Sequence, residues 1–359
     1  MQPLHIGAEP FAESYRTPLR KPKSFQFVIL KAMHQSFLSP RFSLFLPCLL
    51  VLSTALAQPR ASKHSTPHPQ PSGPHRTITV TPEIVESGSP ELIRVEAAEA
   101  SAVEGEWLGH PVLFFSSADH RAWYALAGVD VETPPGPSTL KVSVHLKNGA
   151  HELTAPILVK PAHYRTESLS VSSKFVEPDP EALKQINAES ELKKKIFATS
   201  ADHPLWTQGF RAPVKAPPTD SFGTRRMFNG KLASIHKGMD FRAPAGTSVL
   251  AGNAGKVILA QPMYYEGGCV IIDHGLGLMS LSMHLSRIDV KVGDTVTRGQ
   301  RVGLSGATGR VTGPHLHWAI RWQGAMLDPA KLLRLNLDNL QEGPAQPIAK
   351  PVPPPPALH

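Results

Sequence analysis

The stretch Gly313-Pro314-His315-Leu316-His317-Trp318 is the part of this 359-residue chain from which its interpretation starts. Its two histidines are separated by one residue within an alternating apolar run, so a β-strand would point both side chains to the same side of a sheet. Two imidazoles placed together can both bind a metal ion, or one can bind while the other moves a proton. The stretch therefore predicts a site for metal chemistry built on a strand.

Other side chains that could bind metal precede this stretch. His236 and Asp240 are four residues apart, and His284 stands alone between them and the histidine pair. Histidine nitrogens and carboxylate oxygens are typical zinc ligands, and catalytic sites usually hold zinc through three protein ligands and one water. Each of these residues, taken singly, would more often be a structural or surface residue. Taken together, they predict a catalytic zinc site.

Composition and charge indicate a globular protein with room for two domains. Hydrophobic residues make up 41% of the chain and charged residues 18%. The net charge is +8, and the first 57 residues hold six Lys/Arg against two Glu, so the remainder carries +4. This mild basicity fits attraction to an anionic polymer such as a cell wall. Because no stripe of basic residues with interleaved aromatics occurs, we expect no nucleic-acid partner.

The N-terminal region, residues 1–57, has the features of an export signal. Arg41 precedes an apolar run at 42–57 that ends in small residues suited to signal cleavage. At sixteen residues, the run is shorter than the roughly 20 that a membrane-spanning helix needs. Since the segment before the run is long, we expect translation to start at Met33. The mature chain should then begin at Gln58, lack a stable membrane span, and be periplasmic or extracellular.

The two cysteines do not predict a disulfide. Cys48 lies in the expected signal, so the mature chain would keep only Cys269. Cys48 also lacks the small preceding residue expected before a lipidated cysteine, so we do not expect a lipoprotein. Cys269 lies in an apolar run and is expected to be a small buried residue on a strand.

Sequence patterning predicts a mainly β protein with two domains. Short alternating runs separated by turn residues, such as residues 140–144, are typical of an antiparallel β-sandwich. Asp179 followed by Pro180 indicates the start of a helix, and later Val/Ile/Leu runs alternate with Gly turns. The predicted segments are a signal region at 1–57, a Pro/Ser/His-rich linker at 58–76, an Ig-like β-sandwich module at 77–162, a connector at 163–205 with a helix at about 180–197, a Gly-rich antiparallel β domain at 206–335 and a Pro-rich tail at 336–359.

A series of motifs runs through residues from about 206 to 330. The motifs are Phe222-Gly223-x-Arg225, His236-x-Gly238-x-Asp240, Asp273-His274-Gly275, His284-Leu285-Ser286, Val292-Gly293-Asp294, Gly303-x-x-Gly306-x-Thr308-Gly309 and Gly313-Pro314-His315-Leu316-His317. This series resembles peptidase family M23, the LytM or lysostaphin-like zinc endopeptidases. The chain departs from the family at Ser282, where many members carry Tyr. This departure leaves every expected ligand intact. His274 is expected to have a structural role at a strand end.

The resemblance implies a role for each residue of the site. His236, Asp240 and His317 would hold one zinc ion per chain, and His284 and His315 would be the catalytic pair without a bond to the metal. One imidazole of that pair would take a proton from the metal-bound water and return it to the leaving amine. The other, together with zinc, would stabilise the charge that develops on the carbonyl oxygen.

The resemblance also implies a function, that of an exported zinc metalloendopeptidase that hydrolyses peptide cross-links of bacterial peptidoglycan. A second hypothesis is a non-catalytic regulator that activates cell-wall amidases, since some relatives with this fold have lost their ligands. Retention of all five polar positions argues against that hypothesis. A third hypothesis, a wall-binding module alone, leaves the histidine and aspartate set unexplained. Pentaglycine and D-amino-acid cross-links both fit the family, and we favour the latter. The oligomeric state stays open.

Overall fold

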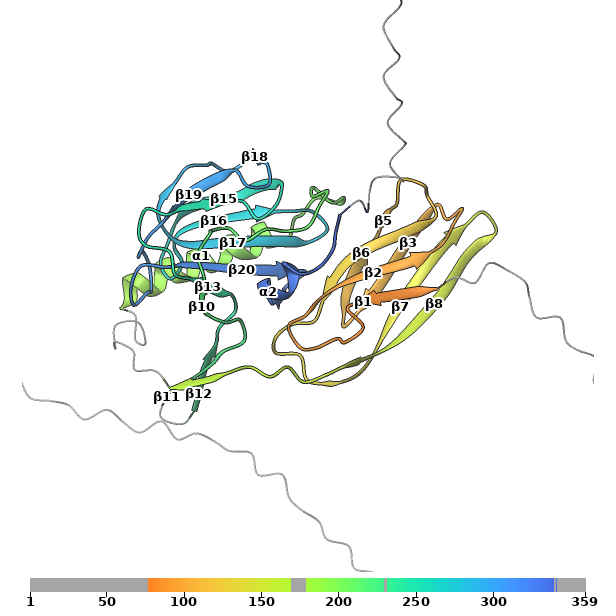
Figure 1. Cartoon of the computed structure of the whole chain (residues 1–359), viewed down its shortest axis with the longest axis horizontal. Helices are drawn as coiled ribbons and strands as arrows, with labels where there is room; N and C mark the ends of the chain where they lie inside the picture. Colours follow the sequence, from red (N-terminus) through yellow and green to blue (C-terminus); the bar gives the residue numbers. More distant parts are fainter. Residues whose placement is uncertain (1–76, 169–178, 229–230, 339, 341–359) are drawn as a thin grey trace, which may run out of the picture. The chain divides into compact units, whose positions relative to one another are not determined.

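The computed structural model describes residues 77–168, 179–228, 231–338 and 340 (Figure 1). The predicted signal region, the linker and most of the Pro-rich tail lie outside these residues. The described residues are mostly strands in antiparallel sheets, with two helices. Neither of these helices is both long and apolar enough to cross a membrane. The mainly β fold class is thus confirmed, whereas the Ig-like character of the first domain stays a prediction.

The first β domain consists of two four-stranded antiparallel sheets. One has the order β1-β2-β6-β5, and its strands are β1 (Ile78–Thr81), β2 (Pro90–Glu96), β5 (Phe115–Ser116) and β6 (Ala122–Gly128). The other has the order β4-β3-β7-β8, and its strands are β3 (Ala102–Trp107), β4 (His110–Leu113), β7 (Gly136–Leu146) and β8 (Gly149–Val159). Alternate residues of both sheets, such as Ile93 and Val95 on β2 and Val142 and Val144 on β7, are buried in one hydrophobic core.

A buried carboxyl group in this domain makes its stability depend on pH. Glu91, on β2, is fully buried, and its Oε1 accepts a hydrogen bond from Ser89 Oγ at 2.5 Å. Burial raises the pKa of Glu91 from 4.5 to about 8. Between these two values the folded state keeps a proton that the unfolded state has released. The free energy of unfolding should therefore fall as pH rises through this window, by up to about 1.4 kcal/mol per pH unit.

Replacing Glu91 with Gln should remove this pH dependence, because the amide does not ionise. We expect denaturant unfolding of Glu91→Gln to show a smaller loss of stability than the wild type between pH 4.5 and about 8. Glu104, which is exposed on β3, provides the matched control. Glu104→Gln should keep the wild-type slope, and a wild-type slope in Glu91→Gln would contradict the prediction.

The second β domain is built on a ten-stranded antiparallel sheet. Seven strands follow the order β10-β13-β20-β17-β16-β15-β18, while β14 pairs with β19, β19 with β17, and β21 with β20. The strands are β10 (Pro218–Asp220), β13 (Met239–Phe241), β14 (Ser248–Leu250), β15 (Gly255–Met263), β16 (Gly267–Asp273), β17 (Leu278–Ile288), β18 (Thr295–Val296), β19 (Arg301–Ser305), β20 (Leu316–Trp322) and β21 (Ala325–Leu327), followed by helix α2 (Pro329–Leu332). Because β13 pairs with β20, two motifs far apart in the sequence become neighbours.

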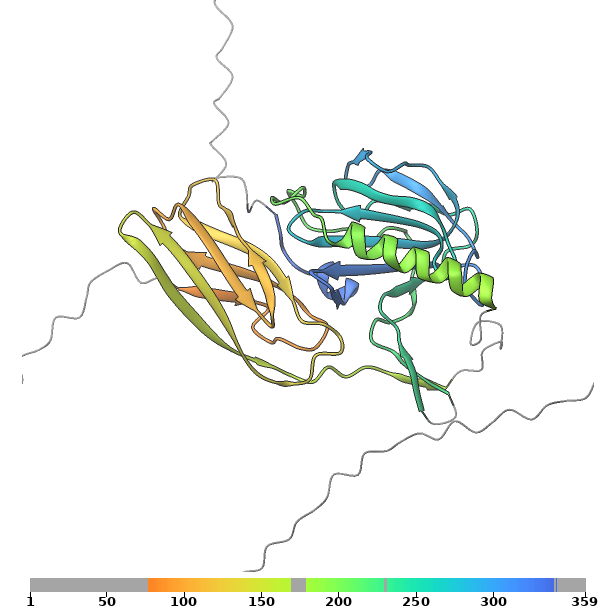
Figure 2. The ribbon, with the colours of Figure 1, turned by 180° about the vertical axis from the view of Figure 1, so that it is seen from behind.

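Helix α1 (Pro180–Phe197) packs against this sheet (Figure 2). It begins after Asp179, whose side chain accepts a hydrogen bond from Ala182 N at 2.8 Å, which satisfies one of the unpaired amides of the first turn. Ile196 and Phe197, near its C-terminal end, pack against a buried cluster of residues from β15, β16, β17 and β20. The helix therefore covers apolar side chains that the sheet would otherwise expose.

Cys269, which the sequence predicted to be buried, and His274, which it placed at a strand end, are both buried. Cys269 lies on β16 and is 2% exposed. His274 follows that strand, with its Nδ1 2.7 Å from the Ala254 carbonyl oxygen and its Nε2 2.8 Å from Ser280 Oγ. Burial lowers the pKa of His274 to about 4, so the ring is neutral at pH 7, donating to the carbonyl and accepting from the hydroxyl. These two contacts fit the predicted structural role at the strand end.

A small three-stranded sheet ties the connector to the second β domain. Strand β9 (Thr166–Ser168) pairs in parallel with β11 (Arg225–Phe228), which pairs in an antiparallel manner with β12 (Lys231–Ile235). The sequence did not predict β9, because its three polar residues have no apolar alternation. The strand forms because the backbone of the connector pairs with the edge of β11.

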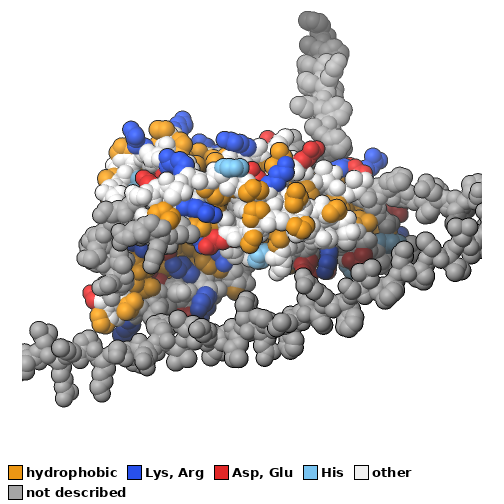
Figure 3. Space-filling view, turned by 90° about the horizontal axis from the view of Figure 1, so that it is seen from below, with side chains coloured by type: hydrophobic (Ala, Val, Ile, Leu, Met, Phe, Trp, Pro, Cys, Tyr) orange, Lys and Arg blue, Asp and Glu red, His pale blue; other side chains and the backbone are white. Residues whose placement is uncertain are grey.

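Surface charge is mixed on the face drawn in Figure 3. Lys and Arg side chains are interspersed there with acidic and apolar ones. That face offers no continuous basic stripe of the kind that follows the phosphates of nucleic acid.

Candidate metal centre

Strands β13 and β20 bring two of the predicted ligands together. In their antiparallel register Asp240 lies directly opposite His317. Opposite residues on one face of a sheet have Cβ atoms about 4.5–5.5 Å apart, which is close enough for their side chains to meet. Asp240 Oδ1 is 2.8 Å from His317 Nδ1. The pairing of the two strands thus brings together two of the three predicted ligands.

His236 reaches this pair from the turn before β13. Its backbone N–H donates to the Thr224 carbonyl at 2.9 Å, which fixes the turn. Its Nε2 lies 3.2 Å from Asp240 Oδ1 and 3.0 Å from His317 Nδ1. Gly238 leaves room for this approach, because a Cβ at that position would lie 2.3 Å from His317 Nε2. A side chain at position 238 would therefore displace a ligand.

The three donor atoms have the spacing of a zinc site. Ligand atoms held 2.0–2.1 Å from a tetrahedral ion lie about 3.3 Å from one another. The three separations here are 2.8, 3.0 and 3.2 Å. His236 and Asp240 are buried and His317 is partly exposed, so the cluster is mostly shielded from solvent. Two imidazoles and one carboxylate also form a ligand set that zinc takes in catalytic sites, so the residues fit the ion.

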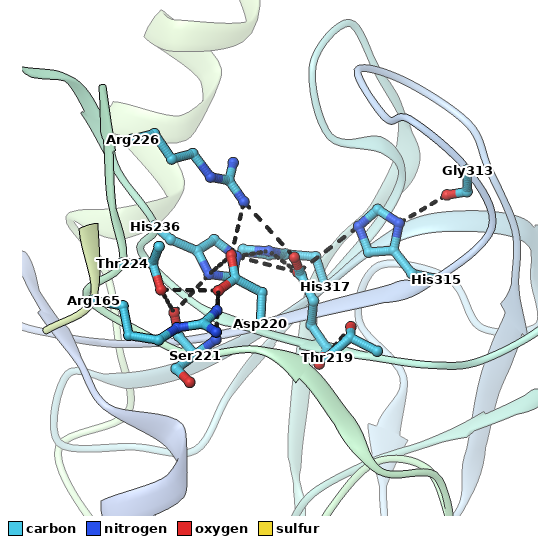
Figure 4. A network of polar contacts seen from close by, with 11 residues as sticks. Arg165, Thr219, Asp220, Ser221, Thr224, Arg226, His236, Gly313, His315 and His317 are labelled. Carbon is cyan, nitrogen blue, oxygen red and sulfur yellow. Dashed lines mark hydrogen bonds and ion pairs between the residues drawn. The ribbon is translucent and has the colours of Figure 1, made fainter. Parts of the chain in front are cut away.

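The other two histidines lie beside this cluster. The ring centroids of His284 and His315 are 4.9 Å apart, and His315 Nε2 is 3.8 Å from Asp240 Oδ1. Figure 4 shows His315 beside His317. His284 Nδ1 lies 3.0 Å from the Thr308 carbonyl oxygen, and His315 Nδ1 lies 2.8 Å from the Gly313 carbonyl oxygen. Because a carbonyl only accepts, each Nδ1 carries the proton, and in the neutral ring each Nε2 is the unprotonated nitrogen.

The backbone of His284 is strained. Its φ angle is +64°, in the left-handed region that residues other than glycine rarely occupy. The pairing of β17 with β16 shifts register across this residue, because Val270 faces Ser282 whereas Gly268 faces Leu285. The pairing of β17 with β19 shifts again just after it, between Leu285 and Arg287. A bulge of this kind re-aims one side chain out of the strand alternation, and such strain is concentrated at functional sites.

Local electrostatics keep these groups in the protonation states that metal chemistry needs. Burial by itself would raise the pKa of Asp240, but hydrogen bonds with His236 and His317 hold it far below its ordinary value. Burial lowers the pKa of His317, although Asp240 opposes this effect. Burial and the nearby His317 and His315 lower the pKa of His284 to about 4. Asp240 is therefore a carboxylate and His317 and His284 are neutral imidazoles, which are the forms that bind metal or accept a proton.

The structure also places at the centre a residue that sequence reasoning missed. Asp220, at the end of β10, has its Oδ2 3.2 Å from His236 Nδ1 (Figure 4). The sequence feature that could have identified Asp220 is its position two residues before Phe222, the first residue of the matching motifs. Nothing in the local pattern indicates that this carboxylate folds against a histidine sixteen positions later.

Comparison with curated proteins gives relatives that act on peptidoglycan. Residues 234–329 match the model of peptidase family M23. The peptidoglycan DD-endopeptidase ShyA of Vibrio cholerae is 39% identical over 133 residues, which is 37% of this chain and 30% of that protein. The peptidoglycan DD-endopeptidase ShyB of the same organism is 41% identical over 125 residues, which is 35% of this chain and 27% of that protein. The chain thus spans less than a third of the length of each relative.

A solved structure extends the similarity beyond the second β domain. A crystal structure from Pseudomonas aeruginosa assigned to peptidase M23 is 33% identical, with a TM-score of 0.54, and the alignment covers 69% of this chain and 94% of that chain. The five histidine and aspartate positions of the centre all lie within the segment that matches the family model. On these grounds the chain belongs to peptidase family M23.

Proposed function

We propose that this protein is a zinc metalloendopeptidase that hydrolyses peptide cross-links of peptidoglycan. The observation that carries the proposal is the convergence of His236, Asp240 and His317 beside the pair His284 and His315. Membership of family M23 supports a peptidase, and the names of ShyA and ShyB support a peptidoglycan substrate. Because both relatives are named DD-endopeptidases, we favour a cross-link between D-amino acids.

The side chains of the site divide into ligands and proton carriers. A zinc ion, when bound by His236, Asp240 and His317, supplies an acidified water and polarises the carbonyl group of the substrate. His284 and His315 have their rings oriented by Nδ1–H donation to backbone carbonyls and can accept a proton at Nε2. The protonated ring can then donate to the leaving amine or to the developing oxyanion.

Digestion of purified peptidoglycan tests this function. The full chain should bind one zinc ion and release uncross-linked peptides, which mass spectrometry identifies together with the bond that was cut. A chelator should stop the release, and added zinc should restore it. Zinc bound in stoichiometric amount with all cross-links intact would contradict the proposal and would favour the non-catalytic regulator.

We infer that the protein acts outside the cytoplasm, in the periplasm or the extracellular envelope. The apolar run at 42–57 and Arg41 before it support export, as does the proposed envelope substrate. All these N-terminal residues lie outside the described part of the chain. N-terminal sequencing of exported material should begin at Gln58. A chain that stays in the membrane and keeps residues 42–57 would contradict this inference.

A further inference from the structure

We propose that Asp220 is a positioning residue that sets the zinc affinity of the centre, and that the connector helps to hold it in place through Arg165. This inference rests on the zinc site of the proposed function and concerns how firmly that site holds its ion. The Asp220 side chain is only 15% exposed. It is not itself one of the three converging donors, because it faces the other nitrogen of the His236 ring.

The first argument is the contact with His236. The Nε2 atom of this ring faces the other ligands, Asp240 and His317, whereas Nδ1 lies 2.9 Å from the Ser221 carbonyl oxygen and 3.2 Å from Asp220 Oδ2. A histidine that binds metal through Nε2 must carry its proton on Nδ1. The groups around Nδ1 then fix the tautomer and the ring orientation, and a carboxylate there makes the ring a stronger ligand.

The second argument is that Asp220 also holds the turn that provides the Ser221 carbonyl. Asp220 Oδ1 accepts hydrogen bonds from Ser221 N at 2.8 Å and from Thr224 Oγ1 at 2.9 Å. The Thr224 carbonyl in turn accepts the backbone N–H of His236. The carboxylate therefore acts on the ligand in two ways, through its charge and through the turn. An amide at position 220 would keep an acceptor for the turn but lose the charge.

The third argument links this carboxylate to the connector. Arg165, directly before β9, places Nη2 2.9 Å from Asp220 Oδ1, and its carbonyl accepts a hydrogen bond from Arg225 N (Figure 4). Arg226 places Nη2 3.1 Å from Asp220 Oδ2. The Arg165 side chain is 63% exposed, so its ion pair is screened by water and should contribute much less than the buried contact with His236.

Zinc affinity of the full-length chain, measured by competition with a chelator, tests the inference without substrate. Asp220→Ala should weaken zinc binding by about 10–100-fold, and Asp220→Asn should weaken it less, because the turn keeps an acceptor. Arg165→Gln should weaken it by about 2–5-fold. The matched control is Asp289→Asn, because Asp289 is 17% exposed and also pairs with two arginines, Arg287 and Arg301, and this variant should bind zinc as the wild type does.

The outcomes separate a positioning role from a structural one. Melting temperatures of the zinc-free proteins report general damage, so a loss of zinc affinity that exceeds any loss of stability supports the inference. If Asp220→Ala does not fold, Asp220→Asn carries the test, with a loss of about threefold or more expected. The inference is overturned if a folded Asp220 variant binds zinc with an affinity within twofold of the wild type. It is also overturned if Asp289→Asn loses as much zinc affinity as the Asp220 variant does. Unchanged affinity in Arg165→Gln overturns the part assigned to the connector.

The same experiment distinguishes this inference from the proposed function. A wild type that binds no zinc overturns both. If the wild type binds zinc and Asp220→Ala shows the expected loss of zinc affinity, but neither protein hydrolyses cross-links, the peptidase function is overturned. The role of Asp220 is then still supported. If the wild type hydrolyses cross-links and Asp220→Ala binds zinc with unchanged affinity, the peptidase function is supported and the role of Asp220 is overturned.

Discussion

Replacing His236, Asp240 or His317 with Ala is expected to abolish zinc binding and cross-link hydrolysis together. The three donor atoms lie 2.8–3.2 Å apart around one point, so the loss of any one leaves a site with two ligands. The loss of affinity should exceed the roughly 10–100-fold that hydrogen-bond partners of a ligand contribute. Zinc content and released peptides should be measured on the same samples.

His203→Ala is the control for these variants. His203 is an exposed histidine that pairs with Asp202, and its replacement should change neither zinc content nor hydrolysis. Treatment of the wild type with a chelator should reproduce the effect of the ligand variants, and zinc should reverse it. Stoichiometric zinc in Asp240→Ala would show that the assignment of ligands is wrong.

Replacing His315 or His284 should leave zinc bound but lower turnover by about 10²–10⁴-fold. Both rings lie beside the cluster and outside the set of three converging donors. Losses of this size are typical of groups that move protons or stabilise an oxyanion. Because His284 has a left-handed φ angle, His284→Asn should be tested beside His284→Ala, since Asn tolerates that conformation better than most residues. The decrease should appear in kcat.

Two other results would change the interpretation of these histidines. Equal loss of zinc in His315→Ala and His317→Ala would mean that both are ligands. Normal zinc and normal turnover in His315→Ala and His284→Ala, with only a lower melting temperature, would mean that the two residues stabilise the fold and take no part in catalysis. Measuring zinc content, turnover and melting temperature for each variant separates these cases.

The sequence by itself predicted a site for metal chemistry and determined the class of the fold. The spacing of His315 and His317 indicates a shared side of a strand, and both side chains do contact or approach Asp240, at 2.8 Å for His317 and 3.8 Å for His315. The residue types favour zinc, because the candidate ligands His236, Asp240 and His317 are histidines and a carboxylate. Short apolar runs and Gly turns likewise predict a mainly β protein. These features are local, and local patterns are visible without a partner segment.

Only the tertiary structure decided which side chains meet and how they are held. Asp240 and His317 are 77 residues apart, and their contact depends on the register between β13 and β20, which no local pattern encodes. The left-handed turn of His284 follows from a bulge, since histidine itself has no preference for that conformation strong enough to predict it. The position of Asp220 against His236 depends on the hydrogen bond between Thr224 and His236, and its contact with Arg165 depends on β9 pairing with β11. Strand register and bulges are set by packing between distant segments, and for that reason they became visible only in the folded chain.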